Sequence, residues 1–167
     1  MAWIREKIKV NEDFNPLQRQ AVGQEVIDFI VKRSKNSRDK NGKPFPGYSD
    51  SYKKSLDFKI AGKTSKVNLT LSSEMLNSIR LLSHRRGEIT IGFNRGDNLN
   101  NAKAEGNIKG TYGQKTPNPR KARDFLGIST SALETIERKY DLDRNKEQAL
   151  ERLAVIRELL NDDSSTN

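Results

Sequence analysis

The sequence predicts an α+β fold in which a small, mostly antiparallel sheet is packed by an N-terminal helix. Apolar residues recur at helical spacing within residues 16–33, whereas they alternate with polar residues in segments 2–10, 78–84 and 88–93. The last two segments flank Arg-Arg-Gly at 85–87, a composition that indicates a hairpin turn. Long loops and two C-terminal helices complete the predicted architecture.

The first strand and the first helix each carry a local signal. Ile8 and Val10 fall on the same face of a strand, because side chains alternate along an extended chain. Asn15 can cap the following helix, and Pro16 suits its first turn, where no backbone N–H is needed. The helix is therefore expected to begin at residue 16.

Residues 34–66 are predicted to form a long loop, since serine, asparagine, glycine, proline and lysine dominate the first part of this segment. The loop nevertheless contains Phe45, Tyr48 and Tyr52. Ordinary flexible linkers seldom carry three aromatic residues. We therefore expect the loop to pack, either onto the body of the chain or across a boundary to a neighbouring subunit.

Short elements are predicted in the middle of the chain. Leu69 and Leu71 indicate a strand, and Met75 and Leu76 lie in a short helical turn that a preceding serine can cap. A short helix is also expected around residues 98–105. The long segment that follows is polar and broken by glycine, so it is predicted to be a loop.

The C-terminal part is predicted to contain two helices and a tail. In the first helix, three apolar side chains share a face: Leu133, Ile136 and Tyr140. In the second, apolar residues recur at spacings of four, three and four: Ala149, Leu153, Ile156 and Leu160. The expected organisation is a body at 1–128, a helical extension at 129–161 and a disordered tail at 162–167.

The charge is strongly positive and unevenly distributed. The chain has 31 Lys and Arg against 22 Asp and Glu, a net charge of +9. Residues 1–127 hold 25 bases against 13 acids, whereas residues 128–167 hold 6 against 9. A basic body with an acidic end favours attraction to nucleic acid or to an acidic protein surface.

The composition also excludes several classes of protein. The chain has no cysteine, which excludes a disulfide-stapled secreted domain and thiolate metal sites. No apolar run approaches the roughly 18 residues that a membrane span needs. The first ten residues place charges where a signal peptide needs apolar residues, so the chain is expected to stay in the cytoplasm where it is made.

No catalytic, metal or cofactor site is expected. His84 is the only histidine, and a lone histidine without cysteine does not make a usual zinc site. The paired acids of the C-terminal part lie on one helical stretch and a tail, whereas a metal-dependent nuclease needs carboxylates that converge from several elements. A small enzyme is therefore the third hypothesis, behind two binding or structural roles.

Basic residues interleaved with aromatic ones favour a second hypothesis, contact with nucleic acid. Six cations precede Phe45 and Tyr48: Lys32, Arg33, Lys35, Arg38, Lys40 and Lys43. Such a stretch can grip phosphates and stack bases. No named DNA- or RNA-binding motif accompanies it. The alternative is a solvated loop whose aromatic residues pack onto the body.

The segment "RKARDFLGIS" at residues 120–129 combines a cationic cluster with apolar residues. We expect Phe125 and Leu126 to end a buried strand, or to leave it, and to fix the last loop onto the core. Arg120, Lys121 and Arg123 are expected to face outward, towards a neighbouring subunit or DNA.

Three segments together resemble the phage virion-morphogenesis family, the tail-completion and neck proteins of long-tailed phages and Mu-like prophages. "GKPFPGYSDSYKK" is similar to the family's aromatic loop, "LTLSSEMLNSI" to its L-T-G-D-M-L-x-S-I segment, and "RKARDFLGIS" to its P-A-R-P-F-L-G-[LI]-S signature. The order and rough spacing also match, over about residues 14–130. Asp124 stands where the family pattern usually has proline, and Ser73 where it has glycine.

The resemblance implies a structural virion protein and not an enzyme. It implies a ring-forming homo-oligomer, sixfold in symmetry, at the head–tail junction, which caps the tail tube and meets the head–tail connector or stopper protein. The basic charge adds non-specific contact with packaged DNA as an expected interaction, and neither a cofactor nor a membrane is expected. The candidate interface residues are Phe45, Tyr48, Tyr52, Arg120, Lys121, Arg123, Phe125 and Leu126.

Overall fold

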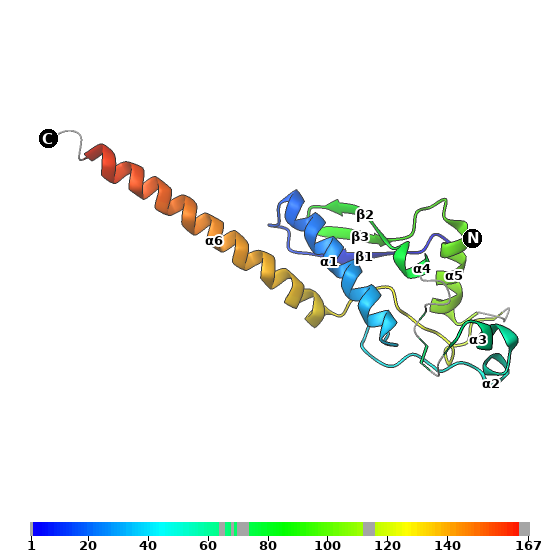
Figure 1. The fold of residues 1–167 in the computed structure, drawn as a ribbon. Helices are drawn as coiled ribbons and strands as arrows, with labels where there is room; N and C mark the ends of the chain where they lie inside the picture. The colour runs from blue at the N-terminus through cyan, green and yellow to red at the C-terminus, as the bar shows by residue number, and fades with distance from the viewer. Residues whose placement is uncertain (1, 64–65, 68, 70–73, 112–115, 164–167) are drawn as a thin grey trace.

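The computed structural model describes residues 2–63, 66–67, 69, 74–111 and 116–163. A body of three strands and several helices carries one long helix that projects from it (Figure 1). In chain order the elements are β1 (Arg5–Lys9), α1 (Pro16–Lys35), α2 (Asp50–Lys53), α3 (Leu56–Ile60), α4 (Glu74–Asn77), β2 (Arg80–Arg85), β3 (Glu88–Gly92), α5 (Asn98–Lys109) and α6 (Thr130–Asp163). The predicted α+β class is confirmed.

The strands form an antiparallel sheet in the order β1-β3-β2. β2 and β3 are joined by a tight turn at Arg86 and Gly87, as the sequence predicts. Ile8 of β1 lies opposite Ile89 of β3 in the register. The pairing of β2 with β3 shifts between Leu81 and Ser83, which marks a bulge.

α1 packs against the sheet through one apolar stripe. Its buried residues include Val22, Val26 and Ile30. Gly23 lies on the same stripe, and a Cβ at this position would come within 2.7 Å of Leu81. The glycine therefore allows the helix to approach β2 closely. The core also contains Phe14, Ile89, Ile91 and Phe93, each at most 1% exposed.

The start of α1 follows the predicted capping chemistry. The side chain of Asn15 accepts a hydrogen bond from the backbone N–H of Gln18 at 2.8 Å. The side chain of Gln18 accepts one in return from the backbone N–H of Asn15 at 2.9 Å. This reciprocal pair is a capping box, and it satisfies two N–H groups that the first turn leaves without partners.

The long segment predicted as a loop at 34–66 contains two short helices, α2 and α3, and α1 extends into it as far as Lys35. Ser49 and Ser55 cap the two helices through their side chains. The helix expected at 98–105 runs further, to Lys109, where Gly110 ends it in the left-handed conformation. The strand expected at Leu69 and Leu71 falls mostly outside the described residues.

The two helical segments predicted at the C-terminus are both helical, and they join into one continuous helix. α6 runs from Thr130 to Asp163 without a break. Its first part packs on the body, where the rings of Phe14 and Tyr140 meet edge to face at 6.4 Å. Asp141 still accepts a hydrogen bond of 3.3 Å from Nδ2 of Asn11, and the later part of the helix projects from the body (Figure 1). Of the predicted tail at 162–167, residues 162–163 are helical and the remainder lies outside the described residues.

Candidate interface segment at residues 120–128

Residues 120–128 form a loop that lies between α5 and α6 in the chain. Phe125 is 0% exposed and Leu126 is 3% exposed, so both side chains belong to the core. They lie in a loop and not at the end of a strand, which corrects the expectation of a buried strand here. The part of the prediction that they fix the last loop onto the core is confirmed.

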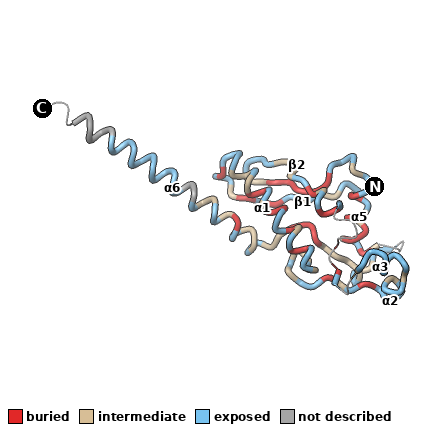
Figure 2. Tube along the Cα trace, viewed as in Figure 1, coloured by how far each residue is buried: buried red, intermediate tan, exposed pale blue. Residues whose placement is uncertain are grey.

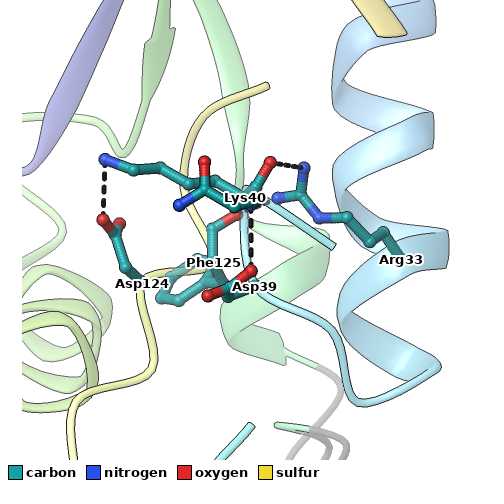
Figure 3. A network of polar contacts seen from close by, with 6 residues as sticks. Arg33, Asp39, Lys40, Asp124 and Phe125 are labelled. Carbon is teal, nitrogen blue, oxygen red and sulfur yellow. Dashed lines mark hydrogen bonds and ion pairs between the residues drawn. The ribbon is translucent and has the colours of Figure 1, made fainter. Parts of the chain in front are cut away.

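Arg33 of α1 holds this segment in place. Its Nη2 donates a hydrogen bond of 2.5 Å to the carbonyl oxygen of Phe125, and its Nη1 donates one of 3.4 Å to the carbonyl oxygen of Lys40 (Figure 3). The Arg33 side chain is buried, and burial lowers its pKa, although the carboxylates of Asp39 and Asp124 act in the opposite direction. One buried guanidinium therefore joins α1, the long loop and the 120–128 segment.

A second connection lies beside the first. The ammonium of Lys40 and the carboxylate of Asp124 form an ion pair at 2.7 Å (Figure 3). The backbone N–H of Lys40 also donates to the carbonyl oxygen of Asp124 at 2.8 Å. The hydrogen bond that this ammonium donates to the Asp124 carboxylate raises the pKa of Lys40. The side chain of Asp124 thus adds an ion pair to the backbone contact between the two segments.

The three aromatic residues of the long loop pack onto the body, as one of the two alternatives for this loop predicts. Tyr48 is 8% exposed and Phe45 is 7% exposed. Tyr48, Tyr52 and Phe58 surround one another, with ring centroids 5.3–5.5 Å apart. Contacts of this kind stabilise a cluster beyond the area they bury.

Arg123 faces inward, so the prediction that it faces outward is wrong. Its guanidinium lies over the ring of Tyr48, 5.3 Å from the ring centroid. Its Nη1 donates a hydrogen bond to Oδ1 of Asn107 at 3.3 Å, and its backbone N–H donates to the carbonyl oxygen of the same residue at 2.7 Å. Burial lowers the pKa of Arg123, although Tyr48 and Tyr52 act in the opposite direction.

Of the predicted interface residues, Arg120 is exposed and Lys121 is half-buried. Tyr52 is also half-buried. The other five are held within the chain, because four are buried and Arg123 turns inward: Phe45, Tyr48, Arg123, Phe125 and Leu126. In this conformation the outer surface of the segment is formed by Arg120 and Lys121, and the buried residues position it.

The predicted basic stretch before the aromatic loop is only partly available to a phosphate. Arg33 is buried and Lys40 is paired with Asp124. Arg38 donates to the carbonyl oxygen of Gly42 at 2.7 Å. Four cations of the stretch are exposed: Lys32, Lys35, Arg38 and Lys43.

Two contacts of this segment were not predicted from the sequence. The sequence predicts Arg33 as part of a phosphate-gripping basic stretch and predicts no role for Asn107, whereas both bond to residues 123–125. Arg33 and Phe125 are 92 positions apart, so no local pattern links them. The one local signal is Asp124, an acid in a cationic and apolar context, which indicates a nearby base.

We searched the described residues for a metal site and for a membrane-spanning helix. Among them, no group of three or more His, Cys, Asp or Glu residues could hold a metal ion. None of the described helices combines the length and the apolarity needed to cross a bilayer. His84 lies exposed on β2. Comparison with family models, with curated proteins and with solved structures finds no match for this chain.

Proposed function

We propose that this chain is a structural virion protein of the phage neck. It forms an oligomeric ring that completes or terminates the tail and joins it to the head connector. The proposal rests on the three sequence segments that resemble the virion-morphogenesis family in order and spacing. It places the chain at the head–tail junction, with itself, the tail tube protein and the connector or stopper protein as partners.

One structural observation supports reading the segments as a unit. The first and third segments, which lie about seventy residues apart in the chain, pack together in space: the guanidinium of Arg123 lies over the ring of Tyr48. Lys40, just before the first segment, pairs with Asp124 of the third. Motifs that contact one another are expected to be retained together, because losing one leaves the other without its packing partner.

Immunogold labelling of intact particles of the phage or prophage that encodes this chain tests the proposal. We expect label at the head–tail junction, and none on the capsid shell or the distal tail. Antibody absorbed with the purified protein is the control. If sealed particles carried no label and the protein stayed in the host lysate, the chain would not be a virion component.

A basic phage nucleic-acid-binding protein is the second candidate function, and one surface favours it. Trp3, Arg5 and Arg95 line an open hollow of about 480 Å³. Trp3 is 37% exposed, and the Arg5 guanidinium lies 4.1 Å from its ring centroid. An aromatic ring with two cations is suited to a nucleotide. A gel shift with DNA that salt abolishes, and that Arg5→Glu with Arg95→Glu removes, would support this function.

A further inference from the structure

The part of α6 that leaves the body is a helix without a partner in the described structure. We call residues 142–157 the arm. Its large apolar side chains are more than half exposed: Leu142, Leu150, Leu153, Val155 and Ile156 (Figure 2). Helices in proteins are stabilised mostly by packing of an apolar face and only weakly by intrinsic propensity. The arm is therefore built to lie against another surface.

The body carries a groove of matching character. It is an open hollow of about 800 Å³ between the C-terminal half of α1 and the segment that joins α4 to β2. Val31 lines it as a half-buried apolar side chain, and the core residues Ile27, Leu76 and Ile79, each at most 5% exposed, form its floor. The exposed cations Lys32, Lys35 and Arg80 also line it. We call it the α1–α4 groove.

The arm and the groove are complementary in the arrangement of apolar and charged residues. At 100° per residue, Leu142, Leu153 and Leu150 follow one side of the arm, and Glu147 and Glu151 follow the next row. Both glutamates are exposed. They lie one helical turn apart, as do Lys32 and Lys35 on α1, so two acids can face two bases along a pair of packed helices.

Two basic side chains lie within the apolar row of the arm, and one acidic side chain lines the groove and can pair with them. Lys146 and Arg157 lie between Leu153 and Leu150 around the helix. Asp28 of α1 lines the same groove as Lys32 and Lys35. A long basic side chain can lay its methylene groups over the apolar lining and carry its charge to that carboxylate.

The arm does not reach the groove of its own chain. The hydroxyl of Tyr140 donates to Glu25 at 3.0 Å, and Lys139 pairs with the same carboxylate at 2.9 Å. These contacts fix the end of the packed part of α6 beside α1. The helix then continues away from α4, which contributes Leu76 and Asn77 to the groove (Figure 1). An unbroken helix cannot turn back, so the arm cannot occupy the groove of its own chain.

We propose that the arm of one copy docks in the α1–α4 groove of the next copy. The contact is head-to-tail, because the arm and the groove are different surfaces of the same chain. Such a contact closes into a ring when the rotation between copies permits and otherwise forms a filament. This inference deepens the proposed function, since it rests on self-assembly and names the surfaces that carry it.

Two charge-reversal variants of the full chain test the proposal. The arm variant carries Glu147→Lys and Glu151→Lys, and the groove variant carries Lys32→Glu and Lys35→Glu. Each alone brings like charges together, so we expect self-association, measured by sedimentation equilibrium at low salt, to weaken about tenfold or more. An equimolar mixture should assemble as the wild type does, because every arm then meets a groove of opposite charge on the other variant.

A matched control reverses two cations outside the groove, Lys54→Glu and Lys59→Glu, which alters the net charge as the groove variant does. This control should assemble as the wild type does. The proposal is overturned if the wild type is monomeric at every concentration, or if the mixture fails to assemble. If the arm variant is weakened while the groove variant is not, the arms pair with one another and the groove is not their site.

The proposal and the proposed function can fail separately. Restored assembly in the mixture, together with no immunogold label at the head–tail junction, would retain the contact and reject the neck function. Label at the junction, together with a mixture that stays dissociated, would retain the function and reject the arm and groove as the contact.

Discussion

The guanidinium of Arg33 donates a 2.5 Å hydrogen bond to the carbonyl oxygen of Phe125, a residue 92 positions later in the chain. The same side chain reaches the carbonyl oxygen of Lys40. α1 thus holds parts of two segments that lie outside the sheet, the long loop and the 120–128 segment. Because these segments have no ladder of backbone hydrogen bonds, their position depends on a small number of side chains, and the effect of changing each can be predicted.

Arg33→Lys is expected to destabilise the protein, although it preserves the charge. A lysine ammonium is a single point, and it cannot reproduce the planar fork whose two nitrogens reach Phe125 and Lys40. Loss of a buried hydrogen bond from a charged group costs about 1.5–3 kcal/mol in the free energy of unfolding. Urea denaturation measures it. The control is Arg38→Lys at an exposed position, with an expected change within about 0.5 kcal/mol; equal losses in the two variants would contradict the role of Arg33.

Phe125→Ala is expected to reduce the free energy of unfolding by about 3–5 kcal/mol, because a fully buried aromatic ring is replaced by a cavity. Arg120→Glu, five residues earlier and exposed, should leave folding unchanged and weaken assembly. Thermal denaturation followed by circular dichroism measures the first effect, and sedimentation measures the second. If both variants were unfolded, the outward orientation of Arg120 would be wrong.

Gly110→Ala is expected to be more damaging than Gly42→Ala. Both glycines have positive φ, 66° and 78°, and the left-handed conformation costs an alanine about 1–2 kcal/mol. At Gly42 nothing lies within 4 Å of an added Cβ, whereas at Gly110 the added Cβ would lie 2.2 Å from the carbonyl oxygen of Asn118. The backbone around Gly110 must therefore move as well. Chemical denaturation of the two variants compares them, and equal losses would show that the close approach adds nothing.

Glu6→Gln is expected to stabilise the protein at neutral pH. Burial raises the pKa of Glu6, which the nearby ammonium of Lys40 opposes and the carboxylate of Asp124 reinforces. The folded chain therefore binds this proton more tightly than the unfolded chain does. The resulting stability is fully present below the unfolded pKa of about 4.3 and is lost as the pH rises through the folded pKa.

The neutral glutamine avoids this loss, so the free energy of unfolding of the variant should exceed that of the wild type at pH 7. The difference should shrink as the pH falls towards 4. Denaturant titrations at several pH values measure it. The effect is small because the carboxyl is only partly buried, and a variant that is less stable than the wild type at pH 7 would contradict the assignment.

Local patterns predicted α1 and the β2–β3 hairpin, although they did not predict α2 and α3. Asn15 and Pro16 placed the start of α1 correctly, and the alternating segments around Gly87 placed the hairpin. The burial of Phe125 and Leu126 was also predicted, because two large apolar residues in a polar chain have few other places to lie. These signals all depend on residues that are close together in the sequence, so they can be recognised before the fold is known.

The positions of Arg33 and Arg123 could not be predicted in this way. A cation is normally assigned to the surface, and its burial depends on carbonyl oxygens and rings that arrive from distant segments. The continuity of α6 was missed for a different reason. The polar run at 141–145 looks like a break, but it contains neither proline nor glycine, so the helix passes through it at small cost.

The strand order β1-β3-β2 has a consequence during synthesis of the chain. α1 emerges from the ribosome long before β3, the central strand it must cover, because 59 residues separate Ile30 from Ile89. At a synthesis rate of about 5–20 residues per second, the apolar stripe of α1 stays uncovered by β3 for roughly 3–12 s. The β2–β3 hairpin then forms within about 1–10 μs and supplies both strands that the helix needs. The helix can therefore be buried by its own chain only after about 90 residues have left the ribosome, and until then its apolar stripe is exposed to chaperones.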